Sequence, residues 1–428
     1  MRCALLYGIL VALLPTLHAD VHTLSLQQAI AIALKQNPDL LLARLDQQRA
    51  QLTARSAKDP FLPKVYAGSG LAWTYGYPLS IEGSAPSIVQ VKAIMSVYNQ
   101  PARYQLAQSK EDVRTAALDE AAKRDEVAYR VAVTYLETNY LARAADAAGN
   151  QAASFKKVAD TVQTRVAEGR ELPVEKSRAE VNLLRAQQRL RNLEADLDYS
   201  QNNLAVLLGY APSDRVRTSD GGTSSEALPE SEASAVDTAL ANSKEVKRIE
   251  SQIQAKGFET KSYHAQKLPK VDLVAQYGLF SRFNNFQQFF QRFQQNNATV
   301  GLSIQIPIVA PAAARALANR GDVEMERLRV EMTSTRDRLA LQTRRAWLNL
   351  QRAQDALKLA QADLDLAREQ LNVVLSQFGE GRTLLRQLEE TRTLENERWI
   401  TLYDAGLALE RARLDLLRQT GGLLAAIR

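Results

Sequence analysis

The spacing of apolar residues changes several times along the chain, and each change predicts a different element. From Leu24 to Lys58 apolar positions recur at helical spacing, with Ser25 as a candidate N-cap and Asn37-Pro38 as a break. Residues 65–77 then alternate from face to face as a strand does, and residues 88–98 alternate more weakly. This part of the chain therefore predicts a broken helix followed by two strands.

A very long helical pattern follows, and the chain then turns back. Residues 101–168 keep a helical period without an internal proline, and about 68 residues at 1.5 Å rise make a helix of about 100 Å. After a turn at Gly169-Arg170 the helical period resumes over 173–208. Its leucines recur at every seventh position, as in a coiled coil: Leu183, Leu190, Leu197 and Leu204. A short turn makes two long helices antiparallel neighbours, so residues 101–208 predict a helix hairpin.

The second half of the chain repeats this plan. Gly169-Arg170 returns as Gly381-Arg382 about 212 residues later, whereas Leu62-Pro63 returns as Leu268-Pro269 at an offset of about 206. The repeat therefore slips by about six residues, and a longer loop at Phe280–Asn297 accounts for the slip. The predicted segments are a first repeat over 20–212, a linker over 213–234, a second repeat over 235–428, strands at 271–280 and 298–309, and a helix hairpin at 311–426.

Residues 1–19 have the features of a secretory signal peptide: a basic start, a short apolar run and a small-residue end. Cys3 is the only cysteine and leaves with this signal, so the mature chain is expected to hold no disulfide or thiolate metal site. No other segment is long and apolar enough for a membrane-spanning helix. The net charge of +6 on 428 residues is small and is attributed to solvated helix faces rather than a nucleic-acid surface.

The loop at Phe280–Asn297 is rich in phenylalanine among glutamine, asparagine and arginine. Such a loop between two strands suits a membrane surface or an oligomer contact. An aromatic platform for nucleic acid is the alternative.

The four predicted strands cannot close a barrel by themselves, because small closed barrels begin near eight strands. An open strand edge has no place in lipid, where its backbone groups would find no partner. If the strands enter a membrane, several chains must share one barrel: three chains supply about twelve strands and two supply about eight. A shared barrel continued by long helices is a conduit.

Over nearly all of its mature length the chain resembles the TolC-like outer-membrane efflux proteins. The matching residues are Leu24–Ile30, Asn37–Leu40, Leu62-Pro63, the paired glycines Gly169 and Gly381, and Leu208-Gly209. The resemblance implies a mainly α fold with a β part: a homotrimeric, twelve-stranded outer-membrane β-barrel continued by a periplasmic α-helical barrel. It also implies a periplasmic adaptor and an inner-membrane transporter as partners, with lipid around the barrel.

In that family the two hairpin ends contact the adaptor and close the tunnel entrance. The matching adaptor-contact positions are Val166, Gly169, Arg170, Glu171, Phe378, Gly381, Arg382 and Thr383. The candidate entrance residues are Glu175, Gln387 and Glu390. Gln387 stands where family members often carry an acidic residue, so the second copy departs from the family pattern at this position. Copies of Glu175 or Glu390 in a narrow mouth would favour cations; the alternative is a solvated helix flank.

The sequence thus predicts a passive outer-membrane exit duct of an efflux or secretion system, opened at its periplasmic end by an adaptor. Two alternatives stay open: a type I protein-secretion duct with the same fold, and a non-conducting periplasmic coiled-coil scaffold. No enzyme is expected, because the three histidines form no ligand cluster and the acidic pairs fit helix-surface charge. No cofactor, metal or nucleic-acid partner is expected either.

Overall fold

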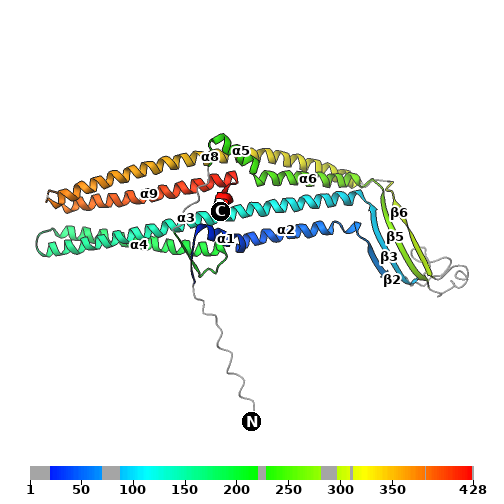
Figure 1. Cartoon of the computed structure of the whole chain (residues 1–428), viewed down its shortest axis with the longest axis horizontal. Helices are drawn as coiled ribbons and strands as arrows, with labels where there is room; N and C mark the ends of the chain where they lie inside the picture. Colours follow the sequence, from blue (N-terminus) through cyan, green and yellow to red (C-terminus); the bar gives the residue numbers. More distant parts are fainter. Residues whose placement is uncertain are drawn as a thin grey trace, which may run out of the picture. The chain divides into compact units, whose positions relative to one another are not determined.

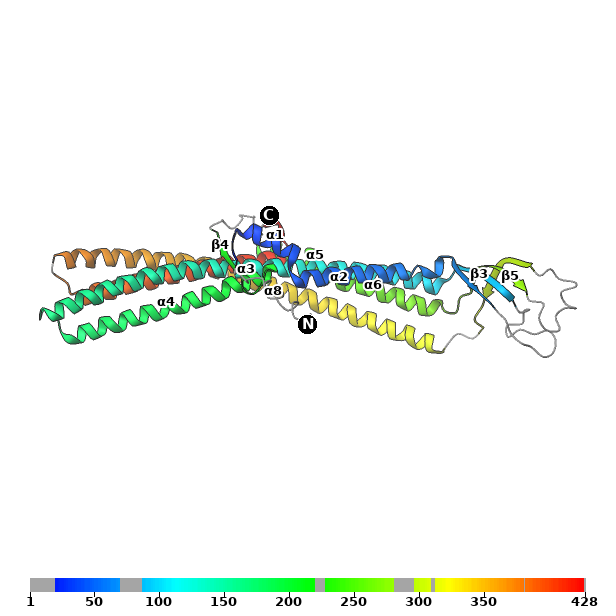
Figure 2. The same ribbon diagram turned by 90° about the horizontal axis from the view of Figure 1, so that it is seen from below.

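A computed structural model of the chain describes residues 20–69, 87–219, 228–280, 296–308, 312–380 and 382–426. Figure 1 labels its longer elements and Figure 2 shows the same ribbon turned by 90°. In chain order these are β1 (Val21–Leu24), α1 (Leu26–Gln36), α2 (Pro38–Ser56), η1 (Asp59–Phe61), β2 (Lys64–Gly68), β3 (Ser87–Tyr98), α3 (Gln100–Ala167), α4 (Pro173–Leu208), β4 (Arg215–Thr218), α5 (Glu232–Asn242), α6 (Lys244–Ala265), β5 (Lys270–Phe280), β6 (Asn296–Gln305), α8 (Ala312–Gly379), α9 (Leu385–Thr420) and α10 (Leu423–Ala426).

The two halves carry the same series of elements, as the repeat predicts. Helices α3 and α8 each contain 68 residues, and α4 and α9 each contain 36. The shorter helices α1 and α5 each contain 11. Pro173 begins α4, and the left-handed glycines Gly209 and Gly421 end α4 and α9.

The chain divides into two compact units, and each unit combines segments that lie far apart in the sequence. The first unit holds Met1–Leu42, Ala121–Ser243 and Arg336–Arg428. The second holds Ala43–Glu120 and Lys244–Thr335.

The largest apolar cluster of the first unit packs α1 against α3 and the end of α4, together with residues of α9 and α10. Alanines on α1 and α3 are completely buried, which lets these helices approach closely. Tyr135 of α3 is 2% exposed, and its hydroxyl donates to the carbonyls of Leu24 and Ser219 at 3.0 and 2.8 Å. These bonds tie α3 to the ends of β1 and β4.

The predicted linker over 213–234 is wrong in two respects. Its residues Arg215–Thr218 form β4, which pairs in parallel with β1, and Val216 within it is fully buried. The following helix α5 also begins at Glu232, where the Ser231 side chain accepts a hydrogen bond from Ser234 N. Strands of four residues are too short for their alternation to be recognised, and their pairing joins segments almost two hundred positions apart.

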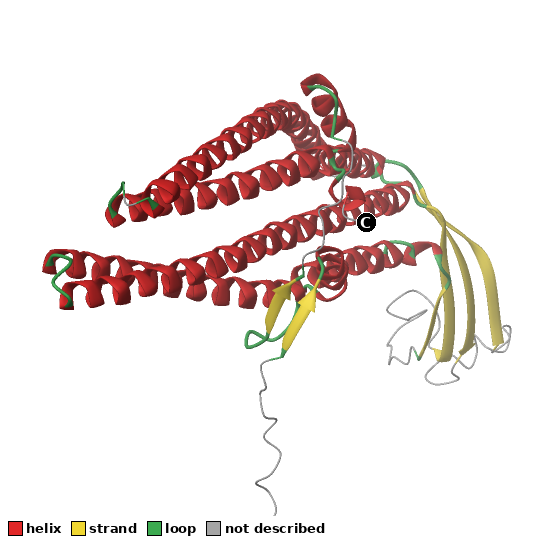
Figure 3. Ribbon diagram, turned by 60° about the vertical axis from the view of Figure 1, so that its left-hand side comes forward, coloured by secondary structure: helices red, strands yellow, loops and turns green. Residues whose placement is uncertain are grey.

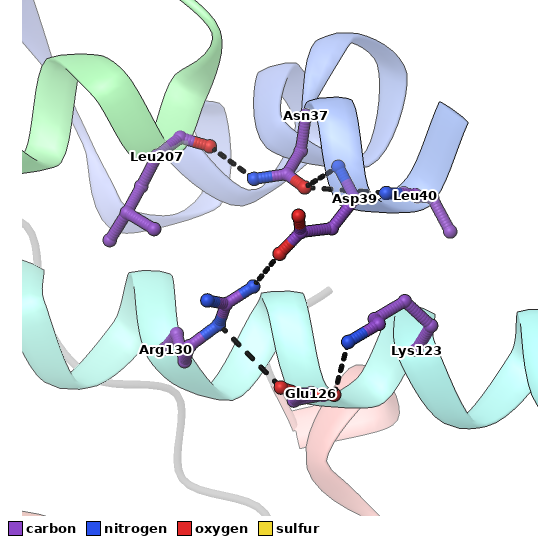
Figure 4. Close-up of polar contacts among 7 residues, drawn as sticks. All are labelled: Asn37, Asp39, Leu40, Lys123, Glu126, Arg130 and Leu207. Carbon is purple, nitrogen blue, oxygen red and sulfur yellow. Dashed lines mark hydrogen bonds and ion pairs between the residues drawn. The ribbon is translucent and has the colours of Figure 1, made fainter. Parts of the chain in front are cut away.

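The predicted break at Asn37-Pro38 is a capped junction between α1 and α2 (Figure 4). The Asn37 Oδ1 atom accepts from the backbone N–H groups of Asp39 and Leu40, while its Nδ2 donates to Leu207 O at 2.8 Å. Asp39 then forms an ion pair with Arg130 of α3. One short polar side chain thereby starts α2 and joins it to the end of α4.

In the second unit, four antiparallel strands form one sheet in the order β2-β3-β5-β6 (Figure 3). The central β3–β5 pair joins the first half of the chain to the second. The last strand begins at Asn296 and ends at Gln305, earlier than the predicted end near residue 309, because Pro307 has no N–H to donate to a strand ladder.

The strand register bears on the six-residue slip between the halves. Lys64 pairs with Ile94, whereas the equivalent Lys270 pairs with Gln305, five positions further along than the first hairpin requires. Most of the slip therefore lies inside the second hairpin. The loop over 281–295, the predicted strand residues 70–77, the predicted signal at 1–19 and Gly381 lie outside the described residues.

Candidate functional site

The turn between α3 and α4, residues Glu168–Leu172, is called here the first tip. Gly169 has a left-handed φ of 71°, and the N–H of Arg170 donates to Arg165 O at 2.8 Å. This pattern closes the end of α3 and requires a residue that tolerates positive φ. The Arg170 side chain is 76% exposed and pairs with Glu168 at 3.1 Å.

The second tip, between α8 and α9, repeats this geometry at its described residues. The N–H of Arg382 donates to Gln377 O at 2.8 Å, again five residues back. The Arg382 side chain is also 76% exposed and pairs with Glu380 at 3.0 Å. The Thr383 hydroxyl donates to Gln387 Oε1 at 2.7 Å. The side chain of Gln387, a predicted entrance residue, therefore has a hydrogen-bond partner four residues before it in the chain.

Sequence reasoning missed one exposed apolar residue at each tip. Leu172 is 65% exposed and Leu384 is 69% exposed. Each leucine lies three positions after its tip glycine, and this shared spacing was the available signal. By contrast, the predicted contact residue Val166 packs against a small apolar cluster between α3 and α4, and Phe378 is partly buried.

Close to the first tip, α4 and α9 bring charged side chains around a hollow of ≈ 160 Å³. Glu175 accepts two hydrogen bonds from Arg178, at 2.8 and 3.0 Å. Glu389 faces it from α9, and its buried Oε1 atom has no hydrogen-bond partner among the described residues. Burial, and then the charge of Glu175, raises the pKa of Glu389 above its ordinary value.

The structure thus brings the predicted entrance residue Glu175 next to Glu389 rather than Glu390. Glu390 is 70% exposed and pairs with Arg386 on its own helix at 3.7 Å. Adjacent positions on a helix point about 100° apart, so sequence spacing alone did not decide which glutamate faces α4.

Three polar contacts join α3 of the first hairpin to α9 of the second. Tyr129 donates to Asp415, Tyr140 donates to Asp404, and Arg411 pairs with Glu137. Arg418 also lies over the Tyr129 ring, 4.6 Å from its centroid. Burial and the hydrogen bond to the aspartate raise the pKa of each tyrosine to about 12, so both hydroxyls stay protonated donors at neutral pH.

The sheet has one apolar face and one polar face. The register places alternate residues of all four strands on the apolar face, among them Val65, Val91, Leu273 and Leu302. On β6 this face is open: Val300, Leu302 and Ile304 are 76, 62 and 62% exposed. The other face carries Lys92, Gln276, Thr299 and similar polar residues. An apolar face of this extent needs a partner or lipid to cover it.

None of the described helices has both the length and the apolar character needed to cross a membrane. Within the same residues, no group of three or more His, Cys, Asp or Glu side chains is arranged to hold a metal ion.

Comparison with known proteins identifies the relatives of the chain. A sequence profile of the family described as Outer membrane efflux protein matches residues 29–210 and again residues 235–422. The two matches coincide with the two halves of the repeat. A search of curated protein sequences finds no match.

Several solved structures share the fold. The CmeC outer membrane channel of Campylobacter jejuni superposes with a TM-score of 0.78 at 15% identity, covering 93% of this chain and 86% of that one. The outer membrane protein VceC of Vibrio cholerae gives 0.77 at 15% identity, covering 93% and 96%. The open state of the MtrE outer membrane channel of Neisseria gonorrhoeae gives 0.75 at 16% identity, covering 93% and 89%.

Proposed function

Because the chain belongs to the outer membrane efflux protein family, we propose that it is the exit duct of a multicomponent efflux system. In this proposal three copies share one barrel of about twelve strands in the outer membrane. The helix hairpins extend into the periplasm, and residues 1–19 direct export. The duct is passive, and an inner-membrane transporter supplies the energy.

The two-faced sheet is the observation that carries this proposal. Its outer strands β2 and β6 each pair on one side only within the described residues. Unpaired strand edges are costly in lipid, and joining edges between copies removes them. The open apolar face of β6, with Val300, Leu302 and Ile304, then contacts lipid, and the polar face lines the lumen.

The tips supply the surface that we assign to a periplasmic adaptor. Each tip exposes one arginine and one leucine, Arg170 with Leu172 and Arg382 with Leu384. Arginine is enriched in protein–protein interfaces, and an exposed leucine beside it adds apolar area that a partner can cover. Adaptor binding at both tips would separate the hairpins, and the α3–α9 contacts of Tyr129 and Tyr140 would break as the entrance opens.

Single-channel recording in a planar bilayer tests the duct. Purified mature protein should give discrete, long-lived conductance steps. The same recording on the variant Tyr129→Phe/Tyr140→Phe tests whether a silent wild-type channel is only closed at rest, because this variant lacks two contacts between the hairpins. Inserted protein that stays silent in both forms, or protein that never inserts, would favour the coiled-coil scaffold.

A type I protein-secretion duct would conduct in the same way and differ in its partner. Cross-linking from cysteines placed at Arg170 and Arg382 in cells should therefore recover an adaptor of a small-molecule efflux transporter. Recovery of a protein-secretion transporter would replace the efflux assignment.

A further inference from the structure

One row of residues runs across the polar face of the sheet at mid-strand. Tyr66 of β2 pairs with Lys92 of β3, Lys92 pairs with Gln276 of β5, and Gln276 pairs with Thr299 of β6. Directly paired residues lie on the same face of a sheet. Lys92 is therefore the charged member of an otherwise uncharged row.

Among the described residues this face carries two further lysines, and each forms an ion pair with an aspartate. Lys64 forms an ion pair with Asp59, and Lys270 pairs with Asp272 at 2.9 Å. Asp272 also accepts a hydrogen bond from Ser96 and is only 6% exposed. Both ion pairs lie at the ends of their strands. Lys92 has no carboxylate within ion-pair distance among the residues that the structure describes.

The polar face is open beside Lys92. Lys92 borders a hollow of ≈ 460 Å³ on the polar face, together with Gln276, Gly278 and Asn297. At Gly68 and Gly301, two nearby positions on β2 and β6, an added Cβ would meet no atom within 4 Å. The space beside Lys92 is thus polar, open and free of compensating charge from the described strands.

We propose that Lys92, repeated by each copy of the chain around the closed barrel, gives the barrel lumen a preference for anions. This inference rests on the proposed function, since only a shared barrel turns one lysine into a ring. Ammonium groups that line a pore attract anions and repel cations, and the low-dielectric wall concentrates the effect. Anionic solutes are the substrate class that such a ring would pass most readily.

The test is the reversal potential of single channels in a potassium chloride gradient. Wild-type protein is compared with Lys92→Arg, Lys92→Gln and Lys92→Glu. Lys92→Arg should keep the wild-type reversal potential because it keeps the charge. Lys92→Gln should shift it toward the potassium equilibrium potential, and Lys92→Glu should shift it further. The control is Lys261→Gln, which removes the charge of an exposed lysine on α6, outside the sheet. It should cause no shift of the reversal potential.

All variants carry the same charges at the periplasmic mouth. A difference in reversal potential between them therefore comes from position 92. Each form is also recorded with Tyr129→Phe/Tyr140→Phe to cover a closed entrance. Conducting channels whose reversal potential is the same for Lys92→Arg, Lys92→Gln and Lys92→Glu would overturn the Lys92 ring and leave the duct standing. Inserted wild-type and Tyr-to-Phe proteins that both fail to conduct would overturn the duct, and the ring with it.

Discussion

Asn37 and Asn242 make the same kind of contact in the two halves of the chain. Each donates a side-chain amide hydrogen to a backbone carbonyl at the end of a returning helix, Asn37 to Leu207 at 2.8 Å and Asn242 to Thr420 at 3.0 Å. Asn37 does more, because its Oδ1 atom also caps α2 through Asp39 N and Leu40 N. The two halves therefore share this contact between an asparagine amide and a helix-end carbonyl, and Asn37 in addition caps the following helix.

Replacing Asn37 by alanine should destabilise the protein by about 1–3 kcal/mol, because it removes a helix cap and leaves the partly buried Leu207 carbonyl without this partner. Asn37→Ser keeps a cap acceptor and is too short to donate to Leu207 O, so its loss should be smaller. Thermal unfolding of the purified protein measures both. Equal losses for the two variants would contradict the capping role.

Gly209 and Gly169 form a matched pair for testing close packing. Both have positive φ, 88° and 71°. An added Cβ at Gly209 would lie 2.9 Å from Gln36 O, whereas at Gly169 it would meet nothing within 4 Å. Gly169→Ala should cost only the backbone strain, about 1–2 kcal/mol. Gly209→Ala should cost about 1–3 kcal/mol more, because α1 must move. Thermal unfolding that ranks the two alike would rule out the clash.

The tyrosine contacts between α3 and α9 should hold the hairpins together. Tyr140→Phe removes the hydrogen bond to Asp404 and leaves most of the ring packing. We expect more frequent channel opening at neutral pH, with a small loss of stability of about 0.5–1.5 kcal/mol. Tyr199→Phe, at a 73% exposed tyrosine of α4, is the control. Unchanged opening in Tyr140→Phe would show that the Tyr140–Asp404 contact does not hold the entrance closed.

These tyrosine contacts also have a defined pH window. A pKa raised from 10.0 to about 12 means that the folded state holds the proton more tightly than the unfolded state. The resulting stability is complete below about pH 10 and is lost as the pH rises toward about 12. Both hydroxyls therefore stay protonated between neutral pH and about pH 9, and their titration should cause no change in opening over that range, as recordings across it can check.

Glu389 should make the contact between α4 and α9 sensitive to mild acid. Its raised pKa means that folding favours the protonated form, so the stability it contributes is complete below its ordinary pKa and is lost as pH rises through the folded value. Glu389→Gln should therefore raise the unfolding temperature near neutral pH and change it little in acid. Glu390→Gln, on the exposed side of α9, is the matched control. A flat difference between Glu389→Gln and wild type across pH would contradict this role.

The two faces of β6 should differ in their tolerance of charge. Leu302→Arg/Ile304→Arg places two charges on the apolar face and should block membrane assembly, at about 2–4 kcal/mol per arginine at mid-membrane. Ser303→Arg, between them on the polar face, should assemble. Membrane fractionation and detection of the oligomer measure the outcome. Normal assembly of the double variant would count heavily against the barrel.

The sequence by itself determined the elements and their duplication. Prolines, tip glycines and an unbroken helical period placed the long helices within a residue or two of α3 and α4, because these signals are local. Alternation predicted strands near β3, β5 and β6 for the same reason. The family resemblance depended on this duplicated order rather than on any single motif, and both halves match the family profile.

Only the tertiary structure decided which distant segments meet. The β1–β4 pair, the β3–β5 junction between the halves and the choice of Glu389 over Glu390 depend on contacts between segments far apart in the chain. Short strands carry too few residues for a periodic signal, and a helix period does not say which flank faces a neighbour. The place of Lys92 in an uncharged row likewise follows from the cross-strand register, and the ion pairs of Lys64 and Lys270 follow from side-chain contacts that no sequence pattern shows.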